Sequence, residues 1–216
     1  MRTQAFRLLA AAALALAGCA TPPAVVRDPQ SPAVRDLVDL ATLDAGLHFD
    51  LRYATADNFM HVRLYPIAKA SLRRDAAAAL VAAQRELATQ GLGLKVFDAY
   101  RPFSVQQRMW NLIRDERYVS NPAMNAGRHT RGTAVDVTLV DRHGHELPMP
   151  TSFDDFSERA HRRAAGIPED RARNAKLLER AMTRQGFLAY PFEWWHFDLR
   201  GWEKHPPLDV DLTSLP

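Results

Sequence analysis

The chain has 216 residues, with 28 Lys and Arg side chains against 25 Asp and Glu, so its formal net charge is +3. Hydrophobic residues make up 47% and charged residues 25%, which is typical of a globular protein and excludes a disordered one. A single cysteine excludes an internal disulfide framework and any metal site that is built from several thiolates.

The N-terminus has the pattern of a bacterial lipoprotein signal. Arg2 and Arg7 are followed by a run of only Leu and Ala over residues 8–17, which is too short to span a bilayer but suits the apolar core of a signal peptide. Gly18 and Cys19 follow this run and resemble a lipobox, in which the cysteine is diacylated and becomes the new N-terminus. The alternative is an ordinary signal peptide with a chance cysteine.

Cleavage would remove residues 1–18 and leave 26 basic residues against 25 acidic ones, a net charge of +1. We therefore expect no nucleic-acid partner. Residues 19–33 contain four prolines and no apolar periodicity, which predicts a lipidated cysteine followed by an extended tether. Ala20, in the place of an aspartate, resembles the outer-membrane sorting pattern. We expect an exported lipoprotein that is anchored in the outer membrane and faces the periplasm, with one domain at residues 34–216.

The first half of this domain predicts a helix, a strand and a second helix. Small and apolar residues recur at helical spacing over residues 71–90, and Gly91 stands where a helix would end. Residues 94–100 are rich in Val and aromatic side chains and predict a short strand. Ser104 and Gln107 have the spacing of a capping box, which predicts that the second helix begins at Ser104.

The second half predicts a strand, a helix and a last strand. Over residues 133–140, Val135 and Val137 share one strand face while Asp136 lies on the other. A helix is expected over residues 169–186 and a strand over residues 194–199. This mixed order with hairpin-like connections favours an α+β fold with an antiparallel central sheet flanked by helices.

In two places, an acidic residue and a histidine lie within or next to a predicted apolar strand. His129 lies in a glycine-flanked loop shortly before Asp136, and Glu193 precedes His196 in a mostly aromatic stretch. A carboxylate inside a β-branched strand is costly unless it is paired or binds a metal. Two histidines and one carboxylate, with a fourth position left to water, are typical of a catalytic zinc site. Arg101 follows the predicted strand 94–100 and is a third candidate, although it could serve only to pair with Asp98.

Residues three apart on a regular strand point to opposite faces of the sheet. Glu193 and His196 can therefore serve one site only if Glu193 lies in the turn before the strand. Pro191 favours such a turn.

Taken together, these segments resemble the VanX-type D-alanyl-D-alanine dipeptidases, which are zinc metallopeptidases of the hedgehog/DD-peptidase fold. Five blocks of the chain carry the resemblance, in the order of the family: residues 50–59, 98–102, 129–139, 153–158 and 193–196. The resemblance implies one Zn²⁺ per chain with His129, Asp136 and His196 as ligands. It also implies Glu193 as the general acid and base and Arg101 as the stabiliser of the tetrahedral intermediate.

The same resemblance implies that Tyr53 and Asp154 receive the free ammonium of a small dipeptide substrate. The chain departs from the family at one point, because Gly127 stands where a serine commonly lies two residues before the first histidine. This departure leaves the zinc ligands in place. Because Gly127 and Arg128 lie beside the expected zinc site, the selectivity for one end of the substrate stays open. No protein partner is expected.

Three functions remain open at this point. The first is hydrolysis of D-Ala-D-Ala to free D-alanine in cell-wall peptide turnover or recycling. The second is a D,D-carboxypeptidase for longer peptidoglycan stem peptides, which Asp154 disfavours because an extended N-terminus would leave its carboxylate unpaired. The third is a non-catalytic zinc-containing binding lipoprotein, which the joint presence of Glu193 and Arg101 disfavours.

Overall fold

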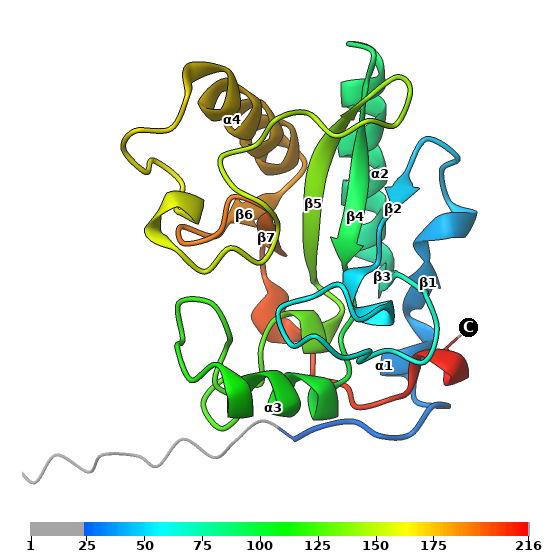
Figure 1. Cartoon of the computed structure of the whole chain (residues 1–216). Coiled ribbons are helices and arrows are strands. Elements are labelled where there is room, and N and C mark those ends of the chain that lie inside the picture. The colour runs from blue at the N-terminus through cyan, green and yellow to red at the C-terminus, as the bar shows by residue number, and fades with distance from the viewer. Residues whose placement is uncertain (1–23, 216) are drawn as a thin grey trace, which may run out of the picture.

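The structure is a computed structural model that describes residues 24–215. The predicted signal peptide and Cys19 lie outside the described residues. A central sheet of five strands organises the domain (Figure 1). In spatial order its strands are β2 (His48–Phe49), β4 (Leu92–Asp98), β5 (Ala134–Asp141), β7 (His196–Leu199) and β6 (Phe187–Ala189).

The predicted α+β class with flanking helices is confirmed, and the sheet is antiparallel except at one edge. The strands β4, β5, β7 and β6 pair antiparallel, whereas the two-residue strand β2 joins β4 in parallel. A second sheet holds only β1 (Leu37–Asp39) and β3 (Ser71–Arg73), which pair antiparallel.

Two long helices cover one face of the central sheet. The apolar sides of α2 (Arg74–Ala88) and α4 (Glu169–Arg184) pack in one core with Val135 and Val137 of β5. In Figure 1, α3 (Phe103–Leu112) lies across the end of the sheet, near the four-residue helix α1 (Pro32–Arg35). The opposite face of β5 carries Asp136, so the strand alternation that the sequence predicted separates the core from the polar residues.

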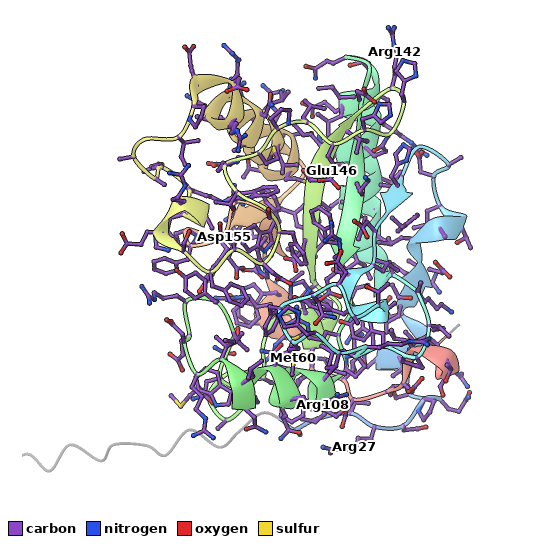
Figure 2. All side chains as sticks on the ribbon, in the orientation of Figure 1. Arg27, Met60, Arg108, Arg142, Glu146 and Asp155 are labelled. Atoms are coloured by element: carbon purple, nitrogen blue, oxygen red, sulfur yellow. The ribbon has the colours of Figure 1, made fainter. Side chains whose placement is uncertain are left out.

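Charged side chains such as Arg27 and Arg142 lie at the periphery, while side chains fill the space between the helices and the sheet (Figure 2). Within residues 24–215, the structure holds no helix that is long and apolar enough to span a membrane.

The helix predicted over residues 71–90 is shorter than expected, because residues 71–73 form strand β3. The backbone N–H of Arg73 donates to the carbonyl of Gly132, and its Nε donates to the carbonyl of Arg131, 58 residues away in sequence. These contacts with a distant loop override the local helical pattern.

The predicted capping box at Ser104 is wrong. Helix α3 begins at Phe103, with Pro102 at the N-cap position, so Ser104 is already helical. The backbone N–H of Ser104 instead donates to Asp209 Oδ1 at 2.9 Å. A carboxylate from the C-terminal segment therefore satisfies the helix end that the sequence assigned to a local side chain.

Part of the predicted tether packs on the domain. Val26 forms a parallel bridge with Leu208, donates its N–H to the carbonyl of Pro207 and accepts from the N–H of Asp209. Ser31 then caps α1. Within the described part of residues 19–33, the chain is thus tied to the C-terminal segment from Val26 onward.

Candidate active site

Three neighbouring strands place polar residues side by side in one row. Asp98 of β4 lies opposite Asp136 of β5, which lies opposite His196 of β7. Opposite residues of an antiparallel pair point to the same face of the sheet. A register shift between Val96 and Asp98 marks a bulge at the end of β4 that brings Asp98 into this row.

A tight turn brings His129 to the same place. His129 begins a single 3-10 turn (His129–Arg131), and Gly132 ends it in the left-handed region with φ +68° before β5 starts. A Cβ atom at Gly132 would lie 2.6 Å from Leu37 Cδ2. The turn therefore requires glycine for both its backbone angle and its close packing.

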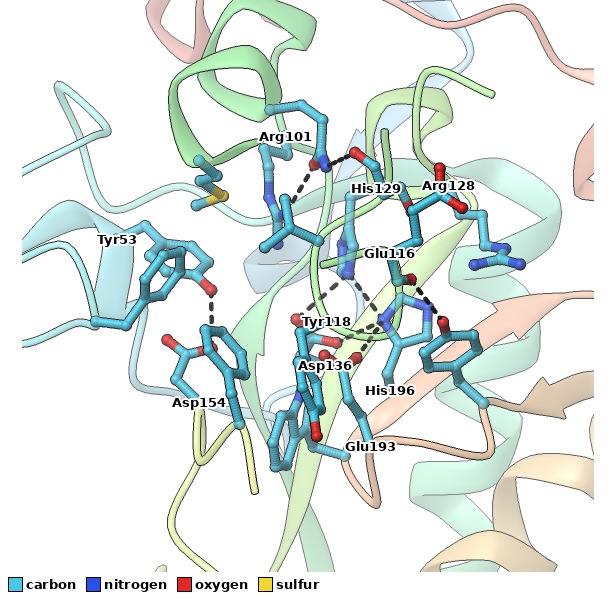
Figure 3. Close-up of a pocket in the computed structure, with 18 residues that line it drawn as sticks. Tyr53, Arg101, Glu116, Tyr118, Arg128, His129, Asp136, Asp154, Glu193 and His196 are labelled. Atoms are coloured by element: carbon cyan, nitrogen blue, oxygen red, sulfur yellow. Dashed lines mark hydrogen bonds and ion pairs between the residues drawn. The ribbon is translucent and has the colours of Figure 1, made fainter. Parts of the chain in front are cut away.

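The three predicted metal ligands meet with their donor atoms converging (Figure 3). His129 Nε2 lies 3.1 Å from His196 Nδ1 and 3.3 Å from Asp136 Oδ2, and His196 Nδ1 lies 3.0 Å from Asp136 Oδ1. A tetrahedral zinc ion with bonds of about 2.0–2.1 Å would hold its ligand atoms about 3.3 Å apart. The donor set therefore fits a divalent metal ion of this size.

The surroundings of His129 fix which of its nitrogens faces the metal position. Its Nδ1–H donates to the carbonyl oxygen of Ala99 at 2.7 Å, so that in a neutral ring Nε2, which is turned toward Asp136 and His196, would be the nitrogen with the free lone pair. A backbone carbonyl thus sets the tautomer that a metal ligand needs.

Protonation of the metal-free cluster follows from its burial and charges. Burial would raise the pKa of Asp136, but His129 and His196 outweigh it and hold that pKa well below its usual range. Burial would lower the pKa of His196, but the carboxylates of Asp198 and Asp136 raise it to about 10. A bound divalent cation would displace this proton, because a histidine ligand must be neutral.

Glu193 directly follows the turn at Pro191 and Phe192 and precedes strand β7, so the prediction that it lies before the strand rather than within it is confirmed. Its side chain is buried, and its Oε2 is 3.7 Å from His196 Nδ1. Burial raises the pKa of Glu193 well above its usual value in the metal-free protein, and although His196 lowers it, the charges of Asp136 and Asp154 raise it. A carboxyl group beside the metal donors is thereby able to hold a proton.

Arg101 both pairs with Asp98 and lines the cavity. Its Nε and Nη2 donate to Asp98 Oδ2 at 3.0 and 2.7 Å, and its Nη1 donates to Gln106 Oε1 at 2.8 Å. Asp98 also accepts from the hydroxyl of Tyr65 at 2.8 Å. Burial would lower the pKa of Arg101, but Asp98 outweighs it and raises that pKa. The guanidinium is therefore a fixed positive charge.

Tyr53 and Asp154 form the other end of the cavity. The Tyr53 hydroxyl donates to Asp154 Oδ1 at 3.0 Å, although the residues are 101 positions apart. Asp154 Oδ2 is buried and has no hydrogen-bond partner among the described residues. Burial, with a contribution from Asp136, raises the pKa of Asp154 to about 8. A buried carboxyl oxygen without a donor is suited to a cationic group.

All seven predicted site residues line one cavity (Figure 3). Arg128, whose effect on selectivity the sequence left open, lines the cavity too. The sequence did not predict several further lining residues, among them Glu116 and Tyr118 after α3 and Tyr190 after β6. Aromatic side chains in loops resemble ordinary core residues, and no motif in the sequence singled out Glu116.

The sequence profile of the family described as D-Ala-D-Ala dipeptidase matches residues 33–205. The chain belongs to this family. It is 39% identical over 173 residues to the D-alanyl-D-alanine dipeptidase of Escherichia coli (strain K12), which covers 80% of this chain and 89% of that protein. It is 34% identical over 175 residues to the D-alanyl-D-alanine dipeptidase of Enterococcus faecium, which covers 72% and 87%.

Membership of the D-Ala-D-Ala dipeptidase family makes the chain an enzyme, a metallopeptidase, and the metal that the family implies has its candidate site at His129, Asp136 and His196. Among solved structures, VanYB in complex with D-Alanine-D-Alanine aligns with a TM-score of 0.41 and 17% identity, over 62% of this chain and 75% of that one. The D,D-dipeptidase VanXYg aligns with a TM-score of 0.40. Scores at this level add nothing to the family assignment.

Proposed function

We propose that the chain hydrolyses the dipeptide D-Ala-D-Ala to free D-alanine with one Zn²⁺, in cell-wall peptide turnover or recycling. The observation that carries the substrate assignment is the unpartnered Oδ2 of Asp154, which lines the same cavity as the three metal donors. An ammonium group at Asp154 would place the following peptide bond toward His129, Asp136 and His196.

The bound zinc ion would polarise the scissile carbonyl and lower the pKa of the attacking water. Glu193 would accept the proton of that water and return it to the leaving amine, which is general base and then general acid catalysis. Arg101, oriented by Asp98 and Gln106, offers a fixed positive charge where the oxyanion of the tetrahedral intermediate develops.

Asp154 also separates the dipeptidase from its nearest alternative. A D,D-carboxypeptidase acts on a longer peptide whose amino group is acylated, so no ammonium would reach the buried carboxyl group, and an unsatisfied buried polar group is costly. A non-catalytic zinc protein would need neither Glu193 nor Arg101, and both line the cavity. These two observations favour a dipeptidase.

The Glu193→Gln substitution tests the mechanism. Gln preserves the size of the side chain but cannot take up the proton, so we expect turnover of D-Ala-D-Ala to fall by about 10²- to 10⁴-fold. Zinc content should remain one ion per chain, measured by atomic emission. Removal of zinc with a chelator should abolish the activity of the wild type, and added zinc should restore it. Near-normal turnover in the variant would remove Glu193 from the mechanism.

We also propose that the enzyme is an exported lipoprotein, anchored through Cys19 in the outer membrane. The charged start, the Leu and Ala run over residues 8–17 and the position of the sole cysteine after Gly18 support this proposal.

A further inference from the structure

The two ring nitrogens of His196 face different partners. Nδ1 faces the metal donors of Asp136 and His129, while Nε2 lies 2.8 Å from Asp198 Oδ1. His196 and Asp198 are two positions apart on β7, so their side chains share one face of the sheet. Both are buried, with 7% and 5% of their surface exposed. Because an ionised carboxylate only accepts hydrogen bonds, the single proton of the neutral, metal-bound imidazole would lie on Nε2, which leaves the lone pair of Nδ1 for the metal.

Asp198 is itself held from the other side. Its Oδ2 lies 3.1 Å from Arg128 Nε. The Arg128 guanidinium lies over the rings of Tyr190 and Trp202, 5.1 Å from the centre of each. Two aromatic faces and one carboxylate thus restrict the orientation of the guanidinium.

This arrangement links the two histidine-bearing segments. Arg128 directly precedes His129, and Asp198 closely follows His196. The ion pair between Arg128 and Asp198 therefore joins the loop that carries one ligand to the strand that carries the other. In Figure 3, Arg128 lies on the far side of the metal ligands from Tyr53 and Asp154. Arg128 is the residue whose role the sequence left open.

We propose that Asp198 and Arg128 are positioning residues of the metal site. Asp198 fixes the tautomer and ring orientation of His196, and Arg128 holds Asp198 and fastens the His129 loop to β7. The inference rests on the zinc site of the proposed function. Carboxylate partners of metal-bound histidines typically change metal affinity by about 10- to 100-fold when they are removed.

The test measures zinc affinity directly, by competition with a chromogenic chelator, for the wild type and for the variants Asp198→Asn and Arg128→Met. We expect Asp198→Asn to bind zinc about 10- to 100-fold more weakly, and Arg128→Met to show a smaller loss in the same direction. Thermal unfolding of the metal-free proteins is measured alongside, so that a loss of zinc affinity can be separated from a general loss of stability.

Asp141→Asn is the matched control. Asp141 ends β5, and its Oδ2 lies 3.3 Å from His145 Nδ1, so it also forms an Asp–His pair, but an exposed one that is not part of the metal cluster. Its removal should leave zinc affinity unchanged. Equal zinc affinity in Asp198→Asn and the wild type would overturn the proposal. An Arg128→Met variant with unchanged zinc affinity and a raised KM would also overturn the proposal. Arg128 would then contact the substrate and would not position the metal ligands.

A second measurement needs no variant and therefore does not depend on the folding of Asp198→Asn. A long-range ¹H–¹⁵N spectrum of the zinc-loaded wild type should show His196 with its proton on Nε2 and its metal on Nδ1. The opposite tautomer would overturn the proposal. If the wild type bound no zinc, the proposed function itself would fail, so the two failures are distinguishable.

Discussion

Asp154 combines three unusual features at the scale of a single residue. Its backbone has φ +60°, in the left-handed region; Tyr53 donates to one of its oxygens; and the other oxygen has no partner among residues 24–215. Strain and an unsatisfied buried polar atom both reduce the stability of the folded protein. Such a residue is expected where a ligand, rather than the fold, completes the interaction.

The raised pKa of Asp154 predicts a pH-dependent loss of stability. Its ordinary pKa is 3.8, and burial raises it to about 8 in the folded metal-free protein. The protonated form is therefore favoured by folding, and its contribution is complete below about pH 4 and lost as the pH rises toward 8. Asp154→Asn should differ little in stability from the metal-free wild type near pH 4 but unfold several degrees higher at pH 8. Calorimetry at both pH values measures this, and parallel curves for the two proteins would contradict it.

The sequence predicted the catalytic and metal-binding residues but missed most of the residues whose hydrogen bonds fix the orientation of those side chains. His129, Asp136, Glu193, His196 and Arg101 stand in short motifs, so their residue types and spacing were informative. Apart from Asp98, which the sequence already paired with Arg101, the partners that orient them were not predicted, because they come from elsewhere in the chain or from the backbone. Examples are Gln106, which binds Arg101, and the carbonyl of Ala99, which binds His129.

At the scale of elements, strand register builds the site. The alternation over residues 133–140 predicted correctly that Asp136 lies opposite the core face, but pairing register is not encoded in one strand alone. The row formed by Asp98, Asp136 and His196 depends on a bulge in β4 and on the partner strands of β5. For the same reason, local patterns failed at residues 71–73 and at Ser104, where distant segments supply the hydrogen bonds.

Gly132 is the joint between the His129 turn and β5, so its substitution should affect both stability and metal binding. In Gly132→Ala, two effects would destabilise the fold: alanine is strained in the left-handed backbone conformation, and its Cβ atom would lie 2.6 Å from Leu37 Cδ2. We expect a loss of roughly 2–4 kcal/mol in the free energy of unfolding, measured in urea. Gly91→Ala is the control, because Gly91 has φ +72° but no atom near its missing Cβ, and it should lose only about 1 kcal/mol. Equal losses in the two variants would contradict a role for the contact with Leu37.

At the scale of the whole molecule, the N-terminal segment and the C-terminal segment are joined. Val26 bridges to Leu208 between hydrogen bonds to Pro207 and Asp209, so the fold extends beyond the predicted boundary at residue 34. If Cys19 is lipidated, the six residues 20–25 separate it from Val26, where the chain is tied to the C-terminal segment. Six residues reach about 19 Å at 3.1 Å per residue, which would keep the domain close to the membrane surface.

The proposed lipid anchor on Cys19 can be tested by the mass of the protein and by the membrane fraction in which it is found. The wild type, expressed with its full N-terminus in a Gram-negative host, should fractionate with the outer membrane and carry a diacyl modification on Cys19. Cys19→Ser should lack the modification and leave the membrane fraction. An unmodified Cys19 in the membrane-bound wild type, determined by intact mass spectrometry, would refute the proposal.

We expect the cavity to select a dipeptide through the free ammonium group of the substrate. The most direct test is release of D-alanine from D-Ala-D-Ala compared with an N-acylated tripeptide that ends in D-Ala-D-Ala, each with and without a chelator. The Asp154 carboxyl group at one end of the cavity and the metal donors beyond it predict fast, chelator-sensitive release from the dipeptide and little from the blocked peptide. Preference for the blocked peptide would rule out selection of the free ammonium group and make the enzyme a D,D-carboxypeptidase.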